Sequence, residues 1–172
     1  LLAREKFGVR RVWTQAVLRW LNEQGILTAE RYAVASAKLI GWGYSFTSVN
    51  PEVMRTAATL AEWNTDRWPL KQALRYLGSD GVRAEDAAVH GALLVAHAYL
   101  DAVLPETRAA VVQAVGEALG RRGEAERCLS LFESVLPRAF GLNAAGEHDA
   151  TQTLRAWRVA YAQRLVLRRA AP

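Results

Sequence analysis

The chain has 172 residues, of which 51% are hydrophobic and 23% are charged, and this balance excludes an intrinsically disordered protein while it allows one or two compact domains. The formal net charge of +5 is too small for a strongly basic protein. No apolar run approaches the roughly 18 residues that a membrane-spanning helix needs, and the single cysteine, Cys128, excludes a disulfide framework and favours a reducing, cytoplasmic setting.

The first half of the chain predicts one short strand followed by four helices. Residues 7–13 alternate and are rich in valine and aromatic side chains, as is typical of a strand. Cap residues and helix stops predict helices over residues 15–24, 29–40, 51–63 and 68–77. Thr14, Thr28 and Asn50 are the expected N-caps, and Gly25 is the expected glycine after the first helix.

The turn over residues 78–81 is the best internal boundary, because the chain beyond it becomes rich in alanine. Long helices are expected there over residues 83–103, 105–119, 123–136 and 149–169. Pro105 and Pro137 separate them, and residues 141–146 form the longest polar loop. The expected fold class is mostly α, a helical bundle with one short N-terminal strand. The expected domains are residues 1–77 and an alanine-rich helical bundle over residues 82–172.

One predicted helix carries a row of groups that could bind a metal or relay a proton. Asp86, His90, His97 and Asp101 return to nearly the same face, because they are separated by 4, 7 and 4 residues. His90 and His97 are about 10 Å apart along the helix, so they cannot share one ion. We expect a helix edge with two histidines of structural role, and no metal site.

The remaining residues give no catalytic signature. The sequence lacks a phosphate-binding loop, a nucleophile elbow and a glycine fingerprint after a strand. Cys128 lies in a helix among apolar neighbours, with no histidine near it in sequence, and is expected to pack as a small hydrophobic side chain. No catalytic residue and no cofactor are therefore expected in this chain.

The positive charge lies at the end of the chain. All 17 acidic residues lie at or before Asp149, and the excess of arginine follows it, at Arg155, Arg158, Arg164, Arg168 and Arg169. Arg155 and Arg158 are interleaved with Trp157 and Tyr161, a pattern that suits a nucleic-acid backbone or an acidic partner. Leu154, Val159, Ala162, Leu165 and Val166 are expected to supply the apolar face of this helix. The alternative is a solvated face, because arginine stems pack over apolar surface and cations are favourable at a helix C-terminus.

The first 77 residues add a resemblance to a known family. The run from Leu2 to Leu18, LAREKFGVRRVWTQAVL, resembles the end of a PIN-like domain of the kind found in large bacterial conflict-system proteins with helical repeats. The family's last strand is followed by a threonine and a helix, as residues 7–13 are followed by Thr14. Residues 25–28 and 43–47 fit the same pattern.

The resemblance implies a relation to metal-dependent ribonucleases. PIN-like domains hold Mg²⁺ or Mn²⁺ with clustered carboxylates, because two hard cations stabilise the attacking and leaving oxygens. Those carboxylates lie on earlier strands and directly before the segment that matches residues 1–4, and here Glu5 is the one candidate. The resemblance therefore implies that residues 7–13 are the last strand of an incomplete sheet, and that this chain alone does not cleave RNA. It implies Mg²⁺ or Mn²⁺ only when the missing N-terminal segment is supplied.

Two functional hypotheses remain open. The first is the non-catalytic helical portion of a bacterial PIN-like conflict-system protein, whose partner is the missing N-terminal segment of the same protein. The alternative is a helical scaffold or regulatory partner without chemistry, which binds a protein or binds RNA or DNA through the arginine-rich last helix. Neither hypothesis involves a membrane.

Overall fold

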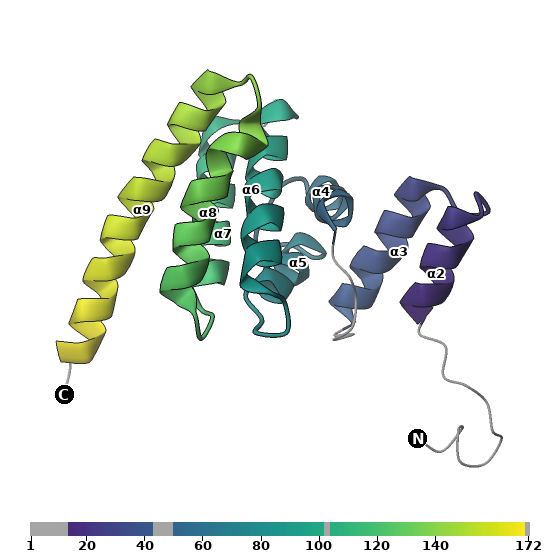
Figure 1. Cartoon of the computed structure of the whole chain (residues 1–172), viewed down its shortest axis with the longest axis horizontal. Coiled ribbons are helices and arrows are strands. Elements are labelled where there is room, and N and C mark those ends of the chain that lie inside the picture. The colour runs from purple at the N-terminus through teal and green to yellow at the C-terminus, as the bar shows by residue number, and fades with distance from the viewer. Residues whose placement is uncertain (1–13, 43–49, 102–103, 171–172) are drawn as a thin grey trace, which may run out of the picture.

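A computed structural model describes residues 14–42, 50–101 and 104–170, and those residues are folded as helices joined by turns, without a strand (Figure 1). The helices are α2 (Thr14–Glu23), α3 (Ala29–Gly41), α4 (Pro51–Leu60), α5 (Leu70–Leu77), α6 (Ala84–Leu100), α7 (Pro105–Gly120), α8 (Ala125–Phe140) and α9 (Ala144–Ala170). The expected mostly α fold class is confirmed. The expected strand over residues 7–13 lies outside the described residues.

The helices follow one another across the molecule from the hairpin of α2 and α3 at one end to α9 at the other (Figure 1). α6 is central, because it packs on α4, α5, α7, α8 and α9. α2 contacts only α3 among the described helices, and α9 contacts α6, α7 and α8. Among the described residues, no helix combines the length and the apolar character that crossing a bilayer requires.

Several helix ends agree with the sequence. The Thr28 hydroxyl accepts a hydrogen bond from the backbone N–H of Arg31, and the Asn50 side chain accepts one from that of Val53. Both residues are therefore the N-caps that the sequence predicts. Gly25 has φ +69°, the left-handed conformation that favours glycine after a helix. Thr14, the other expected N-cap, is instead the first helical residue of α2.

The last two helices are longer than expected. α8 continues through Pro137 to Phe140, although the sequence predicts a stop at residue 136. Phe140 is buried against the ring of Tyr99, and this packing holds the last turn of α8 in place. α9 starts at Ala144, so the second half of the expected loop over residues 141–146 is helix. The Asn143 side chain accepts a hydrogen bond from the N–H of Gly146, which is the geometry of an N-cap.

α4 is shorter than the sequence predicts. It ends at Leu60 instead of near residue 63, because the next residues form a tight turn in which Glu62 and Trp63 both have positive φ. The Trp63 side chain is nevertheless buried in the core. The turn thus directs a large aromatic side chain inward at the end of the helix.

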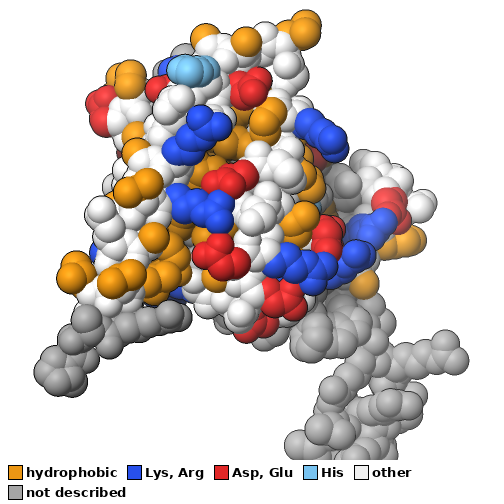
Figure 2. Space-filling view, turned by 60° about the vertical axis from the view of Figure 1, so that its left-hand side comes forward, with side chains coloured by type: hydrophobic (Ala, Val, Ile, Leu, Met, Phe, Trp, Pro, Cys, Tyr) orange, Lys and Arg blue, Asp and Glu red, His pale blue; other side chains and the backbone are white. Residues whose placement is uncertain are grey.

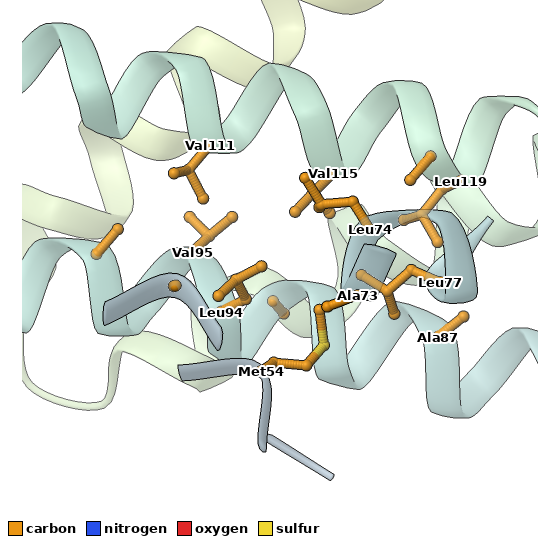
Figure 3. Close-up of a cluster of buried hydrophobic side chains, with 14 of the residues drawn as sticks. Met54, Ala73, Leu74, Leu77, Ala87, Leu94, Val95, Val111, Val115 and Leu119 are labelled. Atoms are coloured by element: carbon orange, nitrogen blue, oxygen red, sulfur yellow. The ribbon is translucent and has the colours of Figure 1, made fainter. Parts of the chain in front are cut away.

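One hydrophobic core runs through the described helices. Figure 3 shows Met54, Leu77, Leu94, Val115 and Leu119 in one buried cluster. Met54 and Leu77 belong to helices that precede the turn over residues 78–81 in the sequence, and the other three belong to helices that follow it. The division of the chain into residues 1–77 and 82–172 stays a prediction. The two helical groups share this core.

A buried arginine joins the two groups at that same turn. Arg122 follows the end of α7 and is 7% exposed. Its guanidinium donates to the backbone carbonyl of Leu77 at 2.9 Å, and to those of Ser79 and Val82. In return, the Asp80 carboxylate accepts a hydrogen bond from the N–H of Gly123. The turn over residues 78–82 is therefore fixed to the end of α7 from both sides.

Candidate functional site

The inner face of α9 lies against two glycines of α7. A Cβ atom at Gly116 would lie 2.9 Å from the indole of Trp157, and one at Gly120 would lie 3.0 Å from the phenol of Tyr161. The two aromatic rings stack with centroids 4.9 Å apart, and the Tyr161 hydroxyl donates to the carbonyl of Gly120 at 2.7 Å. The missing side chains of α7 thus let α9 approach closely, and this contact fixes which face of α9 is turned outward.

The arginines of α9 do not form one surface. Arg158 faces α8, where it makes ion pairs with the carboxylates of Glu126, at 2.9 Å, and of Glu133. These carboxylates raise its pKa, Glu133 most strongly, against the opposing effect of burial. Arg164 faces α7 and lies 3.8 Å from the carboxylate of Glu117. Arg158 is therefore neutralised by its neighbours, whereas Arg164 has only a loose pair.

Arg155 has no carboxylate partner within the described part of the chain, and its side chain is exposed. The side chains of Arg168 and Arg169 lie outside the described residues, so their expected role in binding an anion stays a prediction. The sequence places five arginines on one helix. Among the three whose side chains are described, Arg158 turns to α8, Arg164 turns to α7, and Arg155 turns to solvent.

A second apolar surface lies on the outer face of α9. We define the outer stripe of α9 as Ala156, Val159, Ala160, Gln163, Val166 and Leu167, all exposed. The three large apolar side chains of this stripe, those of Val159, Val166 and Leu167, are between 61% and 69% exposed. Figure 2 shows hydrophobic side chains on the surface at the lower left of the molecule.

The outer stripe lies opposite the packed face of the same helix. At about 100° per residue, its members are grouped on the side of α9 that is turned away from the buried Ala150, Leu154 and Trp157. The prediction that Val159 and Val166 share one apolar face with Leu154 is therefore wrong. α9 has two apolar faces, and only one of them is used in the described fold.

The row of histidines and carboxylates on α6 has structural contacts. Arg55 of α4 forms a bidentate ion pair with the carboxylate of Asp101. Burial lowers the pKa of His90 and that of His97, and the Arg55 guanidinium lowers the latter further. No group of three metal-ligating side chains occurs among the described residues. Asp101 thus joins α6 to α4 through an ion pair, the two histidines are half-buried, and Asp86 is exposed.

Cys128 is fully buried in the core. Its neighbours in the core cluster are apolar, and an inaccessible thiol cannot act as a nucleophile toward a substrate. The expected packing role is the one that the structure shows.

Comparison of the chain with protein-family models, with curated proteins and with solved structures gives no match. The resemblance of residues 1–77 to the end of a PIN-like domain stays a prediction, because the residues 7–13 on which it depends most also lie outside the described part of the chain.

Proposed function

We propose that this chain is a helical protein-interaction module without chemistry of its own, and that it binds an acidic amphipathic helix of a partner protein along the outer stripe of α9. The observation that carries the proposal is the exposure of Val159, Val166 and Leu167 on a face opposite the packed one. Exposed apolar groups at helical spacing are the surface that a second helix covers.

The charges beside the outer stripe indicate which kind of partner helix would bind there. Arg155 lies at one edge of the outer stripe and Arg164 at the other, and no acidic residue follows Asp149 in the sequence. A partner helix with glutamate or aspartate beside its apolar residues would place opposite charges along both edges. A second copy of α9 would instead bring arginine to arginine, and this repulsion disfavours a symmetric pair.

The dimensions and composition of the stripe suit a helix. Ala156 to Leu167 spans roughly 17 Å, about three helical turns. Ala156 and Ala160 are one turn apart, and their small side chains let larger side chains of another helix pack closely there. A lipid surface would favour a broad, continuous apolar face, whereas this stripe is narrow and is interrupted by Gln163.

Photo-crosslinking in the native host tests the proposal. Benzoylphenylalanine is placed at Val159 or Val166, on the stripe, and at the exposed Ser130 of α8 as a matched control. We expect a covalent adduct from the two stripe positions and none from residue 130. Mass spectrometry of the adduct is expected to map the crosslink to an amphipathic segment with acidic residues beside its apolar face.

The same experiment can contradict the proposal. An adduct between two copies of this chain, or one to lipid or nucleic acid, would exclude an acidic helix as the occupant of the stripe. A segment without acidic flanks would contradict the charge argument. The added substitution Arg155→Glu should reduce the adduct yield at Val166, and an unchanged yield would also argue against acidic flanks.

The relation to PIN-like ribonucleases is a separate proposal that rests on the sequence resemblance of residues 1–77. Under it, this chain is the non-catalytic helical portion of a larger protein. Joining the chain to a segment that supplies the missing carboxylates should give cleavage of RNA that depends on Mn²⁺ or Mg²⁺. Absence of cleavage by the joined protein with metal present would contradict this relation and would leave the interaction module unaffected.

A further inference from the structure

A cleft with an excess of positive charge lies between α5, α7 and α9, on the side of α9 that faces α7. Two adjoining cavities of about 490 and 440 Å³ make up the cleft, and both are lined by Glu117 and Arg121. The first cavity extends over Lys71 and Arg75 of α5, and the second extends to Arg164 of α9. The sequence groups Arg164 with the arginines of its own helix, whereas the fold places it with cations from α5 and from the end of α7.

The carboxylates of the cleft do not balance these cations. Glu117 is shared between Arg121, at 3.4 Å, and Arg164, at 3.8 Å. Lys71 lies 3.7 Å from Asp66, which is almost fully exposed. Arg75 has no carboxylate partner within the described part of the chain. Four cations therefore face two carboxylates, and the local field of the cleft favours an anion.

The shape of the cleft favours an extended anion over a single small one. Its wall follows α7 from Ala110 to Arg121, roughly 16 Å along the helix axis. The small side chains of Ala110, Ala114 and Ala118 line this wall and leave it hollow. The cations are distributed over both cavities, with Lys71 and Arg75 in the first and Arg164 in the second, so a ligand that contacts cations in both must be extended.

An aromatic side chain lies at one end of this cleft. Tyr161 lines the second cavity and is only partly buried, and its ring is held by stacking on Trp157 and by the hydrogen bond to the carbonyl of Gly120. A rigid aromatic ring beside guanidinium groups is the arrangement that proteins use to bind the bases and the backbone of a single strand.

We infer that this cleft binds a single strand of nucleic acid, with phosphates near Arg75, Arg121 and Arg164 and with a base against Tyr161. The cleft lies on the side of α9 that faces α7, whereas the outer stripe faces away from it. Arg164 lies at the edge of both surfaces, but Lys71, Arg75, Arg121 and Tyr161 belong to the cleft alone, so this inference does not rest on the proposed function. An acidic helix fits the cleft less well, because the cleft offers mainly alanine side chains to an apolar face.

Binding of a fluorescein-labelled 12-nucleotide uridine RNA to the full 172-residue chain tests the inference, with fluorescence anisotropy read between 50 and 200 mM salt. With two to four phosphates neutralised, we expect log K to fall with log salt with a slope of roughly −1.4 to −2.8. The double variant Arg75→Ala, Arg121→Ala should bind at least about tenfold more weakly and should have a slope shallower by about 1.4. The matched control Arg31→Ala, Arg138→Ala removes two exposed arginines outside the cleft and should bind as the wild type does.

Two further variants separate charge from base contact. Glu117→Gln removes the carboxylate shared by both cavities and should tighten RNA binding by about threefold, because one repulsive charge is lost. Tyr161→Leu removes the ring and should weaken RNA binding by about fivefold or more, with inorganic polyphosphate binding unchanged. Tyr161→Phe keeps the ring and should retain the RNA affinity.

Other outcomes would overturn the inference. Equal losses in the cleft variant and in the Arg31 and Arg138 control would show diffuse charge attraction instead of a site. A Tyr161→Leu variant that weakens RNA and polyphosphate equally would exclude a base contact. Polyglutamate that displaces the RNA at an equal concentration of charge would identify an acidic peptide as the better occupant. Circular dichroism of each variant checks that the protein is folded, so that a changed affinity does not result from unfolding.

Discussion

The indole of Trp157 on α9 lies directly on Gly116 of α7, with two ring carbons 2.9 Å from the place where a Cβ atom would be. Trp157 is 5% exposed, and its ring is also stacked on Tyr161. The pair holds the last helix on the array, and both surfaces proposed to bind a partner depend on how α9 is oriented there.

Gly116→Ala should therefore destabilise the chain by about 1–3 kcal/mol, because a methyl group at this position has no room beneath the indole. Urea unfolding followed by tryptophan fluorescence measures this change. Gly123→Ala is the control, since its Cβ would meet the Asp80 carboxylate at 3.8 Å, an ordinary contact. Equal stability of the two variants would show that α9 can shift to accommodate the methyl group.

Replacement of the buried Arg122 should have a larger effect. Arg122→Met leaves the buried carbonyls of Leu77 and Val82 without this donor, and each buried unpaired group costs about 1–3 kcal/mol. We expect a loss of about 3 kcal/mol in the free energy of unfolding, measured by urea titration. Arg121→Met, at the exposed neighbouring position, should change it by less than about 0.5 kcal/mol. A similar loss for both variants would contradict a specific role for the buried guanidinium.

The histidines of α6 should make stability depend on pH. Burial lowers the folded pKa of His90 and that of His97 below the ordinary value of 6.5, so the unfolded chain takes up protons first as the pH falls. Their contribution to stability is present above pH 6.5 and is lost as the pH falls below it through the folded pKa values. The double variant His90→Gln, His97→Gln should show a smaller difference in unfolding free energy between pH 7.5 and pH 5 than the wild type. The exposed His148, changed to Gln, is the control, and a drop as large as that of the wild type in the double variant would assign the pH dependence to other groups.

The two apolar faces of α9 should respond differently to substitution. Leu154 is 1% exposed, so Leu154→Ala should cost about 2–4 kcal/mol of stability. Val166→Ser on the outer stripe should change stability by no more than about 0.5 kcal/mol, because its side chain is 66% exposed. Thermal unfolding by circular dichroism compares the two variants. A clear loss in Val166→Ser would show that the outer stripe is covered within the folded chain and would remove the basis of the proposed function.

The ends of several helices could be predicted because the signals are local. Thr28 and Asn50 cap the helices that start directly after them, and Gly25 follows one in the expected conformation. The same local reasoning was wrong for residues 144–146, since glycine and asparagine suggest a loop whereas Asn143 caps α9. The local signals also predict that the helix ends before Pro137, whereas α8 continues to Phe140. The packing that holds Phe140 in place cannot be inferred from the neighbouring residues in the sequence.

The candidate sites depended on tertiary contacts and were predicted less well. Arg122 and its carbonyl partners are 40 or more residues apart, so the sequence gives no sign that it is buried while Arg121 is exposed. Lys71 and Arg75 of α5 and Arg164 of α9 likewise line cavities that share Glu117 and Arg121 only because α5 and α9 both pack on α7. The outer stripe is different, because the helical periodicity of the sequence is enough to place Val159 and Val166 more than a quarter turn away from Leu154.

The hydrogen bonds of Arg122 to the carbonyls of Leu77, Ser79 and Val82 affect any attempt to express part of this chain. Expression of residues 82–172 alone would leave a permanently charged side chain beside Val82 with its other two acceptors gone, and the complementary piece would expose apolar side chains of α4 and α5 that now lie against α6 and α7. Neither piece is expected to fold stably on its own. Biochemical work on either proposed surface is therefore best done on the intact polypeptide, with point substitutions in place of truncations.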